Sequence, residues 1–129
     1  MPQHRNMVSA PVRTRLLLAI SALTLVLWAC TVDTLEPLPL DITATADRLT
    51  AAPADSIGFV FRAQGGLLLA VNVAWGDGTT FAQALSGGPR TAVLSLRHAY
   101  QQSGVYQVSA EVEDAAAGTK TATVSVTIQ

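Results

Sequence analysis

The sequence predicts an all-β protein, an antiparallel β-sandwich of about seven strands preceded by an N-terminal export signal. Three observations support this prediction. Apolar and polar residues alternate with a period of two along five segments, which is typical of strands that cover a single core. Short turns rich in glycine separate these segments. After residue 40, no segment carries an apolar face at helical spacing over several turns.

The strands can be placed along the chain from this alternation. The predicted strands lie, in chain order, near residues 40–45, 55–63, 67–75, 79–85, 91–100, 105–114 and 121–129. The turn signals lie at residues 64–66, 76–78, 86–89, 101–104 and 116–118. The side chains expected to face the core are Ile57, Phe59, Phe61, Leu69, Val71, Val73, Trp75, Leu94, Leu96, His98, Tyr100, Tyr106, Val108, Ala110, Val112, Ala122, Val124, Val126 and Ile128. Seven short strands with frequent turns favour a sandwich.

The N-terminus carries the features of an export signal. Arg5, Arg13 and Arg15 form a basic stretch, and an uncharged, mostly apolar run follows at residues 16–29. A basic start, an apolar core of this length and a small residue, Ala29, at its end are typical of a secretory signal peptide. A transmembrane helix needs about 20 apolar residues, so this run is short for a permanent span. The only cysteine, Cys30, comes directly after the run, which excludes an internal disulfide.

The last three residues of this run, together with Cys30, resemble the lipobox of bacterial lipoproteins. Leu27, Ala29 and Cys30 match the pattern, whereas Trp28 replaces the small or β-branched residue that is usual there. The resemblance implies cleavage before Cys30, acylation of its sulfur and, in many species, acylation of the new N-terminus. Two or three acyl chains anchor a protein stably. The alternatives are a plain signal peptide that ends in a cysteine by chance, and an uncleaved N-terminal anchor.

The sequence therefore predicts a lipoprotein signal peptide at 1–29, the lipidated Cys30 with an extended tether at 30–39, and a β-sandwich domain at 40–129. Without the signal, five basic residues remain against nine acidic ones, a net charge near −4. That balance argues against nucleic acid as a partner and against an electrostatic hold on anionic lipid. The lipid on Cys30 predicts a membrane-anchored location in the cell envelope. Thr31 favours the outer membrane where there is one, because some lipoproteins held at the inner membrane carry an aspartate there.

Four motifs follow one another in the second half of the domain. The sequence WGDG ends one strand at 75–78, HAY follows at 98–100, GVYQV at 104–108 and VED at 112–114. Together they resemble the PKD domain, which is named after the polycystic kidney disease protein, and the resemblance covers roughly residues 38 to 129. The matching positions are Trp75, Gly76, Asp77, Gly78, His98, Tyr100, Gly104, Tyr106 and Asp114. The resemblance implies an Ig-like β-sandwich that binds protein or carbohydrate, or acts as a spacer.

Asp77 has two interpretations. Glycines on both sides suit a tight turn, in which the carboxylate accepts hydrogen bonds from backbone N–H groups two residues later. A calcium site would need about six oxygen ligands, normally with several carboxylates close in sequence. Asp55 and Glu111 are distant along the chain, so we expect Asp77 to cap the turn and we keep calcium as the alternative.

His98 is the only histidine after Cys30, so a zinc site that needs several histidines or cysteines is not expected. Ser95 and Ser103 are close in sequence, but neither lies in a nucleophile-elbow motif, so catalysis is not expected either. The PKD resemblance implies that His98 lies in or near the core with its hydrogen bond satisfied. Tyr106 is similar to a tyrosine corner, whose hydroxyl bonds to the backbone upstream.

Three acids near the end of one strand, Glu111, Glu113 and Asp114, are expected to form a solvated acidic edge. Phe81 is the one aromatic residue after Cys30 that is not assigned to the core, which gives little support to a flat carbohydrate-binding surface. We therefore expect a non-enzymatic lipoprotein without a cofactor, whose domain contacts a protein partner or acts as a spacer. A polysaccharide-binding module and a calcium-stabilised adhesion domain remain the alternatives, and an enzyme is the least favoured class.

Overall fold

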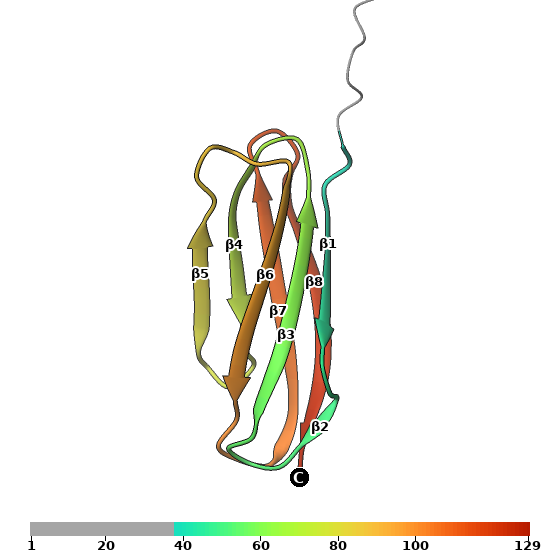
Figure 1. Cartoon of the computed structure of the whole chain (residues 1–129), viewed down its shortest axis with the longest axis vertical. Coiled ribbons are helices and arrows are strands. Elements are labelled where there is room, and N and C mark those ends of the chain that lie inside the picture. The colour runs from blue at the N-terminus through green and yellow to red at the C-terminus, as the bar shows by residue number, and fades with distance from the viewer. Residues whose placement is uncertain (1–37) are drawn as a thin grey trace, which may run out of the picture. The chain divides into compact units, whose positions relative to one another are not determined.

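The computed structural model describes residues 38–129, which form eight strands and no helix (Figure 1). The strands are β1 (Asp41–Ala46), β2 (Thr50–Ala51), β3 (Ser56–Gln64), β4 (Leu68–Ala74), β5 (Thr80–Ala84), β6 (Thr91–Ala99), β7 (Gly104–Asp114) and β8 (Gly118–Ile128). None of these residues belongs to a helix that could cross a membrane. The predicted signal peptide, Cys30 and most of the tether lie outside the described residues.

The strands form two sheets. The first has the order β1-β3-β6, and the second has the order β2-β8-β7-β4-β5. All neighbouring strands are antiparallel except the two-residue β2, which pairs in parallel with β8. This arrangement confirms the predicted all-β antiparallel sandwich. The sequence prediction did not include β2, because two residues are too few to show an alternating pattern.

The alternating strand directions place the connecting loops at two ends. The upper end, as drawn in Figure 1, contains the start of β1 and the loops at 65–67, 85–90 and 115–117. The lower end contains the loops at 47–49, 52–55, 75–79 and 100–103. The predicted WGDG and HAY motifs therefore lie at the same end, although about 20 residues separate them.

The core lies between the two sheets and is built from alternate positions of the long strands. Its buried apolar residues are Ile42, Ile57, Phe59, Phe61, Ala63, Leu68, Val71, Val73, Trp75, Leu94, Tyr100, Val108, Ala110, Val112, Val126 and Ile128. Leu96, Phe81, Tyr106, Ala122 and Val124 pack against this core while remaining partly accessible. Full burial of a large apolar side chain contributes roughly 1.5–3 kcal/mol. The alternation therefore identified most of the side chains that stabilise the fold.

One predicted inward position is wrong. Leu69 is 39% exposed, whereas its neighbour Leu68 is completely buried. The register of β4 against β7 shifts between Leu68 and Ala70, as at a β-bulge. The extra residue in one strand moves the alternation by one position, so Leu68 takes the core site that regular pairing would give to Leu69.

This bulge leads to a test with a matched pair of variants. Leu68→Ala should lower the free energy of unfolding by about 2–5 kcal/mol, because it empties a buried site. Leu69→Ala should lower it by about 1 kcal/mol or less, because that side chain is already partly in solvent. Urea unfolding measures both values. Equal losses, or a larger loss for Leu69→Ala, would contradict the register.

Candidate functional site

The turn between β4 and β5 is shaped by two glycines. Gly76 has a φ of 85° and Gly78 a φ of 91°, which lie in the left-handed region that glycine tolerates best. A Cβ atom on Gly76 would also lie 2.7 Å from a backbone carbonyl oxygen of β7. The amide of Trp75 donates to the carbonyl of Thr79 at 3.1 Å and closes the turn. Asp77 is therefore held at the tip, between two positions that other residues would strain.

The carboxylate of Asp77 is engaged through both oxygens. Its Oδ1 accepts hydrogen bonds from the backbone amide of Thr79, at 3.0 Å, and from the Thr79 hydroxyl. Its Oδ2 lies 2.7 Å from Nε2 of His98, at the end of β6. The two side chains are only 22% and 18% exposed. Asp77 thus organises its own turn and also ties that turn to the other sheet.

These contacts change the acidity of Asp77. Partial desolvation favours the neutral acid and by itself raises the pKa. The hydrogen bonds from the Thr79 hydroxyl, His98 and the Thr79 amide, together with attraction to His98, outweigh that effect and lower the pKa to about 2. Asp77 is therefore ionised at neutral pH, which suits a hydrogen-bond acceptor better than a general acid.

A row of rings extends from the core to this turn. Trp75 packs on Phe59 with ring centroids 5.3 Å apart and stacks on His98 at 4.5 Å with the ring planes 2° apart. His98 meets the edge of Tyr100 at 4.7 Å, and Tyr100 stacks on Tyr106 at 4.2 Å. Aromatic pairs at these separations contribute about 0.5–1.5 kcal/mol beyond the area that they bury. We call these five residues the aromatic row.

Both tyrosine hydroxyls of the row bond to backbone. The hydroxyl of Tyr100 donates to the carbonyl of Trp75 at 2.8 Å inside the protein. Burial, followed by the negative charge of Asp77 and the neighbouring Tyr106, raises the pKa of Tyr100 to about 12. The hydroxyl of Tyr106 donates to the carbonyl of Gln102, four residues upstream, at 2.8 Å. That bond has the form of a tyrosine corner.

A second carboxylate organises the upper end. Asp114 is 3% exposed, and its Oδ2 accepts from the amide of Leu67 at 2.7 Å. Its Oδ1 accepts from the amides of Ala116 and Ala117, each at 2.9 Å. The bonds from Leu67, Ala117 and Ala116, with a smaller contribution from Gly66, outweigh desolvation and lower the pKa of Asp114 to about 2. Asp114 therefore does not belong to the solvated acidic edge expected from the sequence.

The other acids of that edge behave differently. Glu111 and Glu113 are exposed on the outer face of β7, which fits the expectation of solvated carboxylates. Phe81, the aromatic residue left without an assignment, packs against the core. The large hydrophobic residues that are exposed in residues 38–129 include no aromatic side chain. The described surface therefore offers no row of rings for stacking on a sugar.

The sequence did not predict the contact between Asp77 and His98, because 21 residues separate them. The directions of the strands could have predicted this contact. A strand that ends at the WGDG turn and another that ends at HAY both finish at the same end of an antiparallel sandwich. The burial of Asp114 had a weaker signal, because its partners are backbone amides, which any residue supplies.

The geometry leaves few chemical roles open within the described part of the chain. No group of three or more His, Cys, Asp or Glu side chains is placed to hold a metal ion there. His98 has Asp77 as its hydrogen-bond partner, and no serine hydroxyl is bonded to it among those residues.

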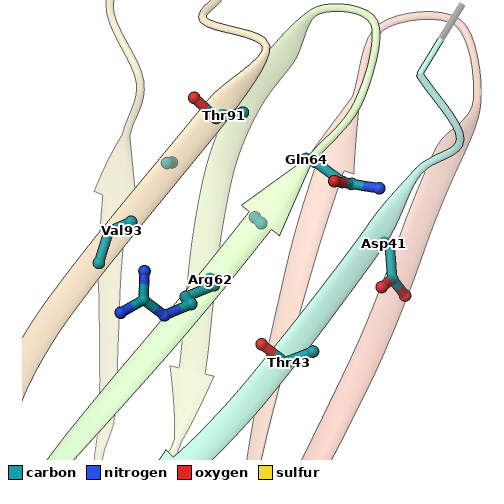
Figure 2. Close-up of a pocket in the computed structure, with 8 residues that line it drawn as sticks. Asp41, Thr43, Arg62, Gln64, Thr91 and Val93 are labelled. Carbon is teal, nitrogen blue, oxygen red and sulfur yellow. The ribbon is translucent and has the colours of Figure 1, made fainter.

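The hollows on the described surface are shallow. The one in Figure 2 occupies about 270 Å³ on the outer face of β1, β3 and β6, and is lined by side chains such as Thr43, Arg62 and Val93.

The role of Asp77 can be tested through the pH dependence of stability. Its folded pKa lies below the usual value of 3.8, so its contribution is complete above pH 3.8 and is lost as the pH falls toward about 2. Asp77→Asn should lower the free energy of unfolding at pH 7 by about 1–2 kcal/mol and make the loss below pH 4 shallower. Chemical unfolding at a series of pH values measures both effects.

The control for this test is Asp55→Asn, at the same end of the domain, which should change the free energy of unfolding at pH 7 by less than about 0.5 kcal/mol.

The alternative role of Asp77 as a calcium ligand has its own test. Calcium and a chelator should both leave the melting temperature of the wild type unchanged. A melting temperature that rises with calcium would contradict the turn-capping role and favour a metal site at Asp77.

Comparison with known proteins identifies the fold. No family model and no curated protein matches the sequence. The PKD domain of an M14-like peptidase from Thermoplasmatales archaeon SCGC AB-540-F20 matches with a TM-score of 0.56 and 19% identity, over 67% of this chain and 91% of that chain. The CARDB domain of the PF1109 protein from Pyrococcus furiosus, solved in complex with di-metal ions, matches with a TM-score of 0.57 and 19% identity, over 72% and 89% of the two chains. The chain therefore has an Ig-like β-sandwich fold similar to those of PKD and CARDB domains.

Proposed function

We propose that this chain is a lipoprotein of the cell envelope, anchored through acyl groups on Cys30, whose Ig-like domain is a non-catalytic module that binds an extended segment of a protein partner. The anchoring part rests on the sequence around Cys30. The binding part rests on one structural observation, the free edge of β6. The two parts are separable, and each has its own test.

A non-catalytic role is supported by the state of the polar groups. A catalytic acid or base needs a pKa near the working pH and access to a substrate. Asp77 and Asp114 instead have lowered pKa values and accept several hydrogen bonds each from the domain itself. Every buried side-chain nitrogen or oxygen within residues 38–129 has a hydrogen-bond partner. The carboxylates of Asp77 and Asp114 are thus used to stabilise loops of the domain.

The edge of β6 is the surface that best fits a partner. β6 ends its sheet, and its nine residues, Thr91–Ala99, pair with β3 on one side only. The other edges are shorter or covered, because β5 has five residues, β2 has two, and β1 lies beside β8 of the opposite sheet. An exposed edge presents backbone N–H and C=O groups to which an extended peptide can add as a further strand.

The side chains of β6 add to this argument. Edge strands are usually protected against pairing by charged residues or proline. β6 contains no proline and a single strongly charged residue, Arg97, whose Nε donates to the hydroxyl of Ser56 at 3.2 Å. Val93 is 58% exposed on the same strand. A partner segment with small or apolar side chains would therefore pair with this edge without meeting a second charge.

The anchor is tested by replacing Cys30. The wild-type chain should be recovered with the membranes and should leave them only with detergent, because buried acyl chains contribute roughly 0.8 kcal/mol per methylene. Cys30→Ser should shift the protein to the soluble fraction or leave it as the uncleaved precursor. Membrane fractionation and the mass of the mature chain give the answer. A Ser variant that is equally membrane-bound and normally processed would refute lipidation.

The edge is tested by site-specific crosslinking. A photoreactive residue at Ser95, in the middle of β6, should form a defined adduct with a partner in cells. The same residue at Asn72, on β4 inside the other sheet, serves as the control and should form none. Val93→Glu should reduce the Ser95 adduct severalfold, because it puts a charge on the pairing edge. Equal adducts at Ser95 and Asn72, or an adduct that ignores Val93→Glu, would contradict docking at β6.

A further inference from the structure

The three loops of the upper end are joined by hydrogen bonds into one unit, here called the upper platform (residues 65–67, 85–90 and 115–117). Leu67 donates its amide to Asp114 at 2.7 Å and accepts at its carbonyl from the amide of Ala115 at 3.0 Å. The amide of Gly65 donates to the carbonyl of Arg90 at 2.9 Å. Each loop is thus bonded to another loop, and the buried carboxylate of Asp114 lies beneath two of them.

The upper platform presents an apolar side chain to solvent. Leu67 is 45% exposed even though its amide and its carbonyl are both fixed. Its side chain lies against Gly88, where an added Cβ atom would overlap it. Leu69, 39% exposed, lies just beyond the loop at the start of β4, and Leu38, 37% exposed, precedes β1 at the same end. The exposed leucine is therefore held in place by the fold.

The two ends of the domain differ in charge. Among the exposed residues of the upper platform, Arg90 is the single charged one, and Asp41, at the start of β1 at the same end, pairs with Lys120 of β8 at 3.3 Å. The lower-end loops carry two exposed aspartates, Asp47 and Asp55, together with the partly exposed Asp77 and one arginine, Arg48. Burying a carboxylate at a lipid interface costs free energy, as does bringing it to an anionic surface. The upper platform is thus the end that can approach a bilayer at the lower cost.

We propose that the upper platform rests on the bilayer that holds the acyl chains, with Leu67 inserted at the level of the headgroups. This inference depends on the lipid anchor proposed above. Leu38 and Cys30 are eight positions apart, so the chain between them spans at most about 28 Å. Since the chain enters β1 at the upper end, that end lies within this distance of the membrane (Figure 1). Tethering makes the contact intramolecular, so a weak apolar contact suffices to orient the domain.

The orientation is measured on the lipidated full chain in phosphatidylcholine vesicles that carry a nitroxide on the headgroup. A fluorophore is attached to a single added cysteine, either Ala116→Cys in the upper platform or Ser103→Cys at the lower end, since acylation blocks Cys30. Quenching at position 116 should exceed quenching at position 103 by at least about twofold. Leu67→Ala should lower the quenching at position 116 toward the level that the tether alone would give, and so narrow the difference between the two positions. Leu49→Ala, which alters a 59% exposed leucine at the lower end, should leave that difference unchanged.

The outcomes separate this inference from the anchor. Equal quenching at positions 116 and 103, in protein that floats with the vesicles, overturns the resting platform and leaves the lipid anchor intact. A chain that does not float with the vesicles lacks the anchor and overturns both proposals. Thermal melting checks that Leu67→Ala is folded. If that variant is unfolded, equal quenching at the two labelled sites in the otherwise wild-type chain still overturns the resting platform.

Discussion

The position of Trp75 between the two sheets is the contact on which the lower half of the domain depends. Trp75 follows β4 of the five-stranded sheet, yet its ring packs on Phe59 of the three-stranded sheet. Its carbonyl accepts a hydrogen bond from the buried hydroxyl of Tyr100, and its ring stacks on His98. His98 in turn bonds Asp77, in the turn that Trp75 itself closes. Trp75 therefore takes part in the packing of the two sheets, supports the contact between His98 and Asp77, and closes the turn.

Two carboxylates perform similar work at opposite ends of the sandwich. Asp77 accepts from a turn and from a histidine, and Asp114 accepts from the amides of two loops. In both cases an ionised carboxylate accepts hydrogen bonds at a place where a strand ends and the backbone hydrogen bonds between strands stop. Charge-assisted bonds of this type are about twice as strong as neutral ones. They help a small domain without an internal disulfide to keep these short loops in place.

The alternation of the sequence was enough to predict the sandwich and most of its core, because burying one face of a strand dictates a period of two. It could not settle the start of β4, since Leu67, Leu68 and Leu69 are equally apolar and either register buries a leucine. It also missed β2 and the contact between Asp77 and His98, which depend on how distant segments meet. The prediction that Asp114 is solvated was wrong because its partners are backbone amides, which every residue except proline supplies and which the sequence therefore does not reveal. Cys30 was found from local sequence alone, and the proposal for it still depends on that sequence.

The order β1-β3-β6 has a mechanical consequence. If the chain is held through Cys30 and a partner adds to β6, a pull between membrane and partner enters and leaves the domain through this sheet. It passes through the six residue pairs between β1 and β3, and then through the nine between β3 and β6. A force directed along the strands loads all the hydrogen bonds of a ladder at once, in shear, so they must break together. The three-stranded sheet would then act as the tensile element of the domain, and the five-stranded sheet would serve mainly to keep it folded.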